Sequence, residues 1–137
     1  MGKQEKGLKA PSPEKINEVL GKAFWQIVEK YQLTQVESAI LLGIKESNRQ
    51  RLNSLKRKQA IPDDPDKALR VSHLVGIHKN LRVLFPHNRE VVYSWLKTKR
   101  DLLNGQSAME YIAQEPLQSL PRIFSIRRLL DQIRVSS

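Results

Sequence analysis

The chain has 137 residues, which allows one domain or two very small ones and excludes a multidomain enzyme. It contains no cysteine, so disulfide frameworks, thiolate zinc sites and cysteine nucleophiles are excluded. Its 24 Lys and Arg residues outnumber its 14 Asp and Glu residues, and the resulting net charge of +10 favours a polyanionic partner such as nucleic acid.

The positive charge is concentrated in the front of the chain. Residues 1–60 carry 12 basic and 6 acidic side chains, whereas residues 101–137 carry 4 of each. A basic front and a neutral back rich in Leu and Ile suggest two different partners, one charged and one largely apolar. No apolar run approaches the ~20 residues that span a bilayer, and the first residues lack the apolar core of a signal peptide. We therefore expect a cytoplasmic protein.

The first helix is predicted to follow a disordered tail over residues 1–11, which contain several lysines and show no periodicity. Ser12 and Pro13 are typical of a helix start, because the serine oxygen accepts an unpaired amide and proline fits the first helical position. Apolar residues then recur at three- and four-residue spacing until the helix ends near Gln32. Trp25 lies at the edge of this stripe and marks either a self-association surface or a partly covered core residue.

The next two helices are predicted to be joined by a tight turn. Thr34 begins a helix with a capping box, because Glu37 three positions later can return a hydrogen bond to the cap amide. Gly43 supplies the flexible backbone that a sharp turn needs, and a third helix is expected from Lys45 or Glu46 to about Lys58.

Helix signals continue to the end of the chain. Asp64 and Pro65 open a long helix that Pro86 stops, and Asn88 can cap the next one, whose apolar positions include Trp95. A capping box at residues 107–110 starts a short helix, and a last helix runs from about residue 120 to residue 134. No segment shows sustained two-residue alternation. The sequence therefore predicts an all-α fold.

Residues 33–44, LTQVESAILLGI, resemble the first helix and turn of Xre-type helix-turn-helix proteins, in which the second helix lies in the DNA major groove. The alternative is an ordinary corner between two helices. In the third helix, Leu52 and Leu55 share one side, and the other side carries residue types that read bases and bind phosphates, although a solvated charged face gives the same pattern. The predicted DNA-binding residues are Gln35, Ser47, Arg49, Gln50, Asn53, Lys56 and Arg57.

Arg49 departs from the Xre pattern, which usually has an apolar residue at this place. Two interpretations stay open at the level of the sequence. Either the third helix is rolled by on the order of 60° so that Leu52 and Leu55 point inward, or the recognition surface has decayed.

Most of the chain, roughly residues 33–134, resembles the MbcA/ParS/Xre antitoxins. The resemblance rests on Asp66-Lys67-Ala68-Leu69-Arg70, on Phe85, on Trp95-Leu96, and on LNGQSAMEYI at residues 103–112. Ala108 stands where the family commonly has proline. The resemblance implies an Xre-like helix-turn-helix domain, which we place at residues 12–62, and a small helical toxin-binding domain at residues 63–137.

The resemblance also implies a function. Such a protein is the antitoxin of a type II toxin-antitoxin system: it neutralises a toxin, often of the NAD-consuming RES class, by direct binding and represses its own promoter. The implied partners are the cognate toxin and duplex DNA, and the implied assembly is a homodimer or a larger complex with the toxin. The alternative is a stand-alone transcription regulator whose C-terminal half dimerises or senses a ligand.

The C-terminal end is the predicted toxin contact, because terminal residues can enter a cleft and arginine suits an acidic pocket. For Phe124 and Leu130, packing into the core is the favoured interpretation. The predicted toxin-binding residues are Arg127, Arg128, Asp131, Arg134, Val135 and Ser136.

The sequence lacks the patterns of an enzyme. Its three histidines do not pair at metal-ligand spacing, and no Gly-rich phosphate loop or nucleophile elbow is present. We expect no metal, no cofactor and no catalytic residues.

Overall fold

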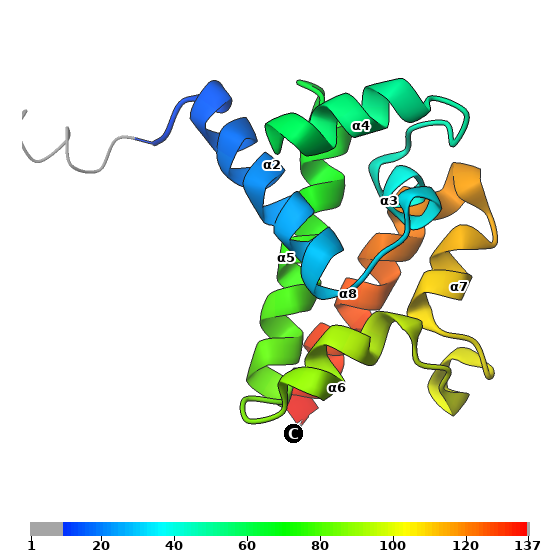
Figure 1. Ribbon diagram of the computed structural model, residues 1–137. Coiled ribbons are helices and arrows are strands. Elements are labelled where there is room, and N and C mark those ends of the chain that lie inside the picture. The colour runs from blue at the N-terminus through cyan, green and yellow to red at the C-terminus, as the bar shows by residue number, and fades with distance from the viewer. Residues whose placement is uncertain (1–9, 137) are drawn as a thin grey trace, which may run out of the picture.

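The computed structural model describes residues 10–136, and this part of the chain is all-helical with no strand (Figure 1), as predicted. Most of the expected disordered tail, residues 1–9, lies outside the described residues. Helix α2 spans Pro13–Lys30, and the Ser12 hydroxyl accepts a hydrogen bond from the amide of Lys15 at 3.2 Å. The predicted serine cap is therefore confirmed.

Helix α3 spans Gln35–Leu42 and begins with the predicted capping box. The Glu37 amide donates to the Thr34 hydroxyl at 3.1 Å, and the Thr34 amide donates to the Glu37 carboxylate at 2.8 Å. Gly43 ends the helix in the left-handed region, with φ of 70°. This backbone conformation favours glycine because it has no Cβ to clash.

Helix α4 spans Arg49–Lys58, so the expectation that it starts at residue 45 or 46 is wrong. Residues 43–48 form a loop that is longer than the predicted tight turn. Ile44 is buried, and the Asn48 amide donates to the carbonyl of Lys45 at 2.9 Å. The chain therefore makes a separate turn after Ile44 before the helix begins.

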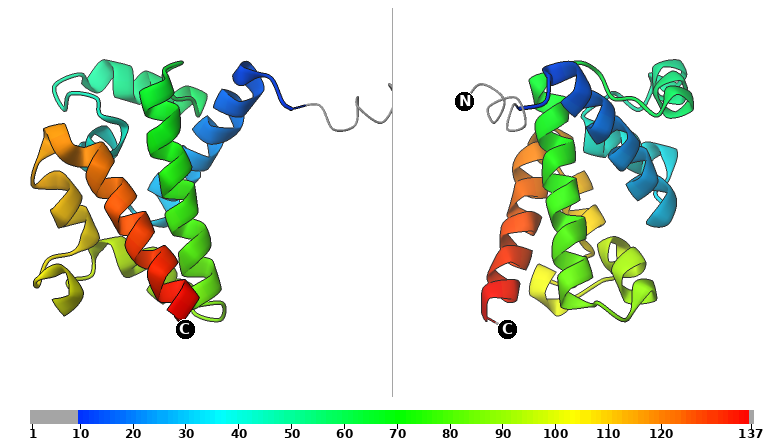
Figure 2. Two further views of the ribbon diagram at one scale, coloured as in Figure 1. Left: turned by 180° about the vertical axis from the view of Figure 1, so that it is seen from behind. Right: turned by 90° about the vertical axis from the view of Figure 1, so that its left-hand side faces the viewer.

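Helices α5 and α8 are the two long elements of the second half. Helix α5 spans Pro65–Leu84 with Asp64 as its predicted cap, and α8 spans Ser119–Ser136. The two helices lie side by side and run in the same direction (Figure 2), because residues early in α5 contact residues early in α8 and late residues contact late ones.

Shorter elements connect α5 to α8. Helix α6 spans Arg89–Ser94 and is followed by two 3-10 turns, η1 at Trp95–Lys97 and η2 at Asp101–Leu103. Helix α7 spans Ala108–Ala113 with the predicted capping box, and a further 3-10 turn, η3 at Pro116–Gln118, leads into α8. Trp95 and Leu96 are buried in a 3-10 turn rather than in the predicted helix.

One hydrophobic cluster joins both halves of the chain. The predicted boundary between residues 62 and 63 falls in the link between α4 and α5, and buried side chains from both sides of it pack together. The large fully buried side chains of this core include Phe24, Leu41, Leu42, Val71, Leu74, Ile77, Leu81, Leu96, Ile112, Ile123, Ile126 and Leu130.

The structure shows whether Trp25 and Phe124 belong to the core. Trp25 is 3% exposed, and its indole N–H donates to the carbonyl of Ala60 at 2.8 Å, so it belongs to the core and not to a self-association surface. Phe124 is 42% exposed, which contradicts the favoured core interpretation. Ile123, Ile126 and Leu130 recur at helical spacing and form the buried side of α8. Phe124 lies outside this side and is partly exposed to solvent.

Candidate functional site

The outer face of α4 carries the predicted DNA-binding residues. Leu52 is 4% exposed and Leu55 packs against the core, so the opposite side of the helix points to solvent. In the right-hand view of Figure 2, α4 lies at the upper edge of the molecule. All seven predicted residues are exposed, with Gln35 at the start of α3, Ser47 in the loop and the other five on α4. The structure therefore places them all on the surface around α3 and α4.

The arrangement around α4 follows from 100° per residue. Gln50, Asn53 and Arg57 lie opposite the buried side and form the middle of the outer face. Arg49 and Lys56 flank this row on one side, and Arg51 and Lys58 flank it on the other. Base-reading residue types thus occupy the centre, with cations along both edges. Arg51 was missed by sequence reasoning, although its place at the edge of the helix is visible from the helical period.

The cations of α4 are free of acidic partners. Helix α4 contains no Asp or Glu, and within residues 10–136 no ion pair involves any of its Arg or Lys side chains. Leu52 is buried, Leu55 is partly buried and packs against the core, and Arg49 is exposed, which is the arrangement that the rolled helix requires. The charged side of α4 is uncovered, and its role in DNA binding stays a prediction.

A hydrogen bond links the two helices at this surface. The Gln35 side-chain amide donates to the Asn53 carbonyl oxygen at 3.1 Å, and both residues are exposed. The bond fixes the positions of two predicted DNA-binding side chains, one on α3 and one on α4, relative to each other. It leaves the amide group of Asn53 available as a donor.

A cationic hollow of about 520 Å³ lies where α4 begins. Ser47 lines it together with Lys45, Arg51 and Lys67, and Asp64 is the one carboxylate in its lining. Three cations beside a helix N-terminus form a suitable environment for a phosphate group.

The segment after α4 is fixed to α2. Trp25 binds the carbonyl of Ala60, and the Asn17 side-chain amide donates to the carbonyl of Ile61 at 3.3 Å. A Cβ at Gly21 would lie 2.7 Å from the carbonyl oxygen of Gln59. Glycine is therefore required here, because the backbone of the link passes directly over α2.

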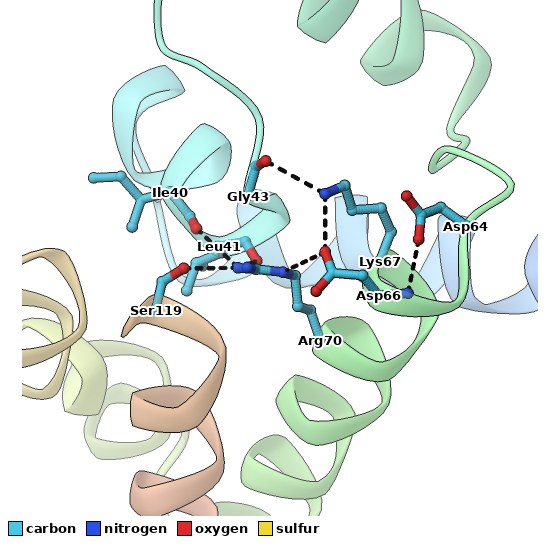
Figure 3. Close-up of polar contacts among 8 residues, drawn as sticks. All are labelled: Ile40, Leu41, Gly43, Asp64, Asp66, Lys67, Arg70 and Ser119. Carbon is cyan, nitrogen blue, oxygen red and sulfur yellow. Dashed lines mark hydrogen bonds and ion pairs between the residues drawn. The ribbon is translucent and has the colours of Figure 1, made fainter. Parts of the chain in front are cut away.

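The guanidinium of Arg70 ties α3, α5 and α8 together behind this surface (Figure 3). Its Nη1 donates to the Ser119 hydroxyl at 2.8 Å and to the carbonyls of Leu41 at 3.2 Å and Ile40 at 3.4 Å. Its Nε donates to the carboxylate of Asp66 at 2.9 Å. Arg70 thus satisfies carbonyl groups at the C-terminal end of α3, where a cation also complements the helix dipole.

Asp66 balances the charge of this cluster. The Lys67 ammonium donates to the Asp66 carboxylate at 2.9 Å and to the carbonyl of Gly43 at 3.3 Å. Partial burial by itself raises the pKa of Asp66, but the hydrogen bonds from Lys67 and Arg70 outweigh it, so the net effect is a lowered pKa. The carboxylate therefore stays ionised and holds both cations under the turn at Gly43.

Three of the predicted toxin-binding residues on α8 are bonded to α5. Asn80, which is 2% exposed, donates to the carboxylate of Asp131 at 2.7 Å and accepts from the guanidinium of Arg134 at 3.0 Å. Arg127 contacts the imidazole of His73 at 3.3 Å, between Nη1 and Nδ1. Sequence reasoning missed Asn80, because a single polar residue in an amphipathic helix gives no signal of what it will face.

The other predicted toxin-binding residues of α8 are exposed to solvent. Arg128 lies 5.9 Å from the centre of the Phe124 ring, and Val135 is 87% exposed. Helix α8 continues through Ser136, whose hydroxyl donates to the carbonyl of Gln132 at 2.9 Å. The described end of the chain is therefore helical through Ser136, two residues beyond the predicted end of this helix at residue 134, and the toxin contact at this end stays a prediction.

The fold and these surfaces define the protein as an all-α bundle that displays one short, strongly basic helix at its edge. No known protein-family model matches the chain. It is 30% identical over 113 residues to a protein of Sinorhizobium fredii (strain NBRC 101917 / NGR234) named uncharacterized protein y4oB, and the match covers 82% of this chain and 81% of that protein. The chain therefore belongs to the same family as the Sinorhizobium protein. Among the helices of residues 10–136, none has the length and apolar character needed to cross a membrane.

Proposed function

We propose that the protein is an antitoxin of a type II toxin-antitoxin system that binds duplex DNA of its own promoter through the α4 surface. The observation that carries the DNA part is the uncovered outer face of α4, where Gln50, Asn53 and Arg57 are exposed between two edges of cations that form no ion pair in the described part of the chain. Arginine, asparagine and glutamine are the residue types that form bidentate contacts with guanine and adenine, and flanking Lys and Arg neutralise phosphates.

The experiment for this part is a gel-shift titration of the full chain with the DNA upstream of its gene, repeated at several salt concentrations. We expect binding at low salt. The logarithm of the affinity should fall linearly with the logarithm of the salt concentration, because counterions are released from the neutralised phosphates. A scrambled duplex of equal length measures the nonspecific part. Absence of binding at low salt contradicts the proposal.

The toxin part of the proposal rests on the resemblance to the MbcA/ParS/Xre antitoxins and on the exposed end of α8. Arg128 and Val135 are exposed and therefore accessible to a partner, whereas Leu130 is buried in the core. Deleting residues after Ile126 removes Leu130 and tests stability together with binding. Substitutions at the exposed positions are therefore the sharper experiment.

We expect co-expression of the chain with the toxin encoded beside its gene, in the proposed system an NAD-consuming RES-type enzyme, to rescue growth and to co-purify the two proteins. The double variant Arg128→Glu, Val135→Asp should lose rescue while keeping its helical content and its affinity for promoter DNA. DNA binding without any growth rescue by the unchanged chain supports the alternative, a stand-alone transcription regulator.

A further inference from the structure

A small hollow of about 270 Å³ lies where α2 meets α5 and α6, away from the outer face of α4. Its lining combines three rings with polar side chains: Tyr31, His78, Tyr93, Lys30, Arg82 and Gln26. A second hollow of about 410 Å³ shares Lys30, Tyr31 and Tyr93 with it. Small-molecule sites typically have volumes of about 300–1,000 Å³ and a few convergent polar groups, and the two hollows adjoin through their three shared residues.

The three rings form the floor of this hollow, which we call the α2–α5 pocket. The rings of His78 and Tyr93 are nearly parallel, with an interplanar angle of 12° and a centroid distance of 6.2 Å. Tyr31 meets both rings edge-on, with centroids 5.8 Å from His78 and 5.4 Å from Tyr93. Tyr31 is almost fully buried, and the partly exposed rings of His78 and Tyr93 present the aromatic surface against which a planar ring can pack.

A hydrogen bond joins Tyr31 and His78, two of the residues that line the pocket. The Tyr31 hydroxyl lies 2.9 Å from Nδ1 of His78, and Tyr31 is 2% exposed. In the tautomer in which this hydroxyl donates to Nδ1, the neutral imidazole carries its hydrogen on Nε2 and can donate it to a ligand. Burial, with a smaller contribution from Arg82, lowers the pKa of His78, which keeps the ring neutral at pH 7.

Two cations flank the rings without acidic partners. Lys30 and Arg82 are exposed, and in the described part of the chain neither forms an ion pair. The Lys30 ammonium lies 6.0 Å from the centre of the Tyr93 ring. No carboxylate lines the α2–α5 pocket, and Glu90 lines only the neighbouring hollow. The pocket therefore offers donors and positive charge but no competing anion.

We propose that the α2–α5 pocket binds a small anion that carries a planar ring. The charged group binds between Lys30 and Arg82 and accepts a hydrogen bond from Nε2 of His78, and the ring packs against the aromatic floor. Two chemical sources fit this description, a nucleoside monophosphate and an aromatic carboxylate. The inference stands independently of the antitoxin proposal, since it uses neither the α4 surface nor the exposed end of α8.

Isothermal titration of the full chain with adenosine 5′-monophosphate and with salicylate tests the proposal. Adenosine and inorganic phosphate serve as probes that carry only the ring or only the charge. We expect saturable binding of at least one of the two ring-bearing anions, and weaker binding of adenosine and of phosphate. Saturation by the monophosphate alone identifies the first source, and saturation by salicylate alone identifies the second.

Two charge variants locate the site. Arg82→Gln and Lys30→Gln should each weaken binding by roughly tenfold, since each removes a charge-assisted contact. Lys79→Gln on the same helix and Lys56→Gln on α4 are matched controls, because neither residue lines the pocket. All four residues are exposed, so the folded structure should survive each change.

Three outcomes overturn the proposal. The first is the absence of saturable binding of both ring-bearing anions at millimolar concentration. The second is equal affinity for inorganic phosphate and for the monophosphate with no binding of salicylate, which shows that the ring contributes nothing. The third is an equal loss of affinity in the control variants, which shows that the anion binds through the net positive charge of the protein and not at the α2–α5 pocket.

Discussion

Helices α4 and α8 both carry several arginines, yet the structure uses them in opposite ways. The arginines of α4 point to solvent and have no ion-pair partner within residues 10–136. On α8, Arg122 donates to the carbonyl of Tyr111 at 2.7 Å, Arg127 contacts His73, and Arg134 donates to Asn80. The difference shows that residue type alone does not separate a surface available for binding from contacts that hold the fold.

The neighbours of each helix explain this difference. Helix α8 lies along α5 and beside α7, so its arginines meet carbonyl, amide and imidazole groups within reach. Helix α4 lies at the edge of the molecule and is held through Leu52 and through the backbone link to α2. Within residues 10–136 its charged side chains form no ion pair, and their exposure makes them accessible to an external polyanion.

The largest expected effect is at Arg70, which joins α8 to α3 and α5. Arg70→Met leaves the carbonyls of Ile40 and Leu41 and the hydroxyl of Ser119 without their donor, so we expect the free energy of unfolding to fall by about 2–4 kcal/mol. Urea denaturation, monitored by circular dichroism, measures this loss of unfolding free energy. Arg128→Met, at an exposed position of α8, is the matched control and should change stability by less than about 0.5 kcal/mol. Equal losses in the two variants contradict the central role of Arg70.

The second prediction tests whether the two sets of cations differ in DNA binding. Lys56→Gln combined with Arg57→Gln should weaken binding to promoter DNA roughly 10- to 100-fold and reduce the slope of log affinity against log salt by about 2. Arg127→Gln combined with Arg134→Gln should leave both quantities unchanged, because these side chains are bonded to α5. Fluorescence anisotropy at four salt concentrations measures both. An equal effect of the two pairs would remove the distinction between α4 and α8.

Two helical glycines give the third comparison. Gly21→Ala places a Cβ 2.7 Å from a backbone oxygen of the link after α4, and we expect a loss of about 1–2 kcal/mol in unfolding free energy. Gly76→Ala meets only the flexible side chain of Arg127, which can move, and alanine favours the helix, so the net change should stay below about 1 kcal/mol. Thermal and urea denaturation compare the two variants. A larger loss at Gly76 contradicts this account.

The smallest expected effect is a pH dependence from His78. Its pKa is lowered in the folded protein by burial and by Arg82, so the unfolded chain takes up the proton first as the pH falls through 6.5. Stability should therefore decrease below this pH. His78→Gln, whose side-chain oxygen can still accept from Tyr31, should flatten the decrease, whereas His87→Gln at an exposed position should not. Unfolding curves at pH 7.5 and pH 5.5 decide between these results.

Much of the helical framework could be predicted because the signals are local. Capping residues lie within three positions of the amides they bind, and the predicted caps at Ser12, Thr34, Asp64, Asn88 and Ser107 are all present. The exposure of the predicted DNA-binding residues also follows from the helical period around Leu52.

What the sequence by itself determined is thus where most helices begin and which side of α4 is charged, since both depend on neighbours a few residues apart. Only the tertiary structure decided that Arg70 would bridge three helices, that Arg127 and Arg134 would bond to α5, and that Tyr31 would meet His78. These contacts join residues 29 to 54 positions apart. They exist because helix packing brings the two side chains together, and helix packing depends on the whole core rather than on any local pattern.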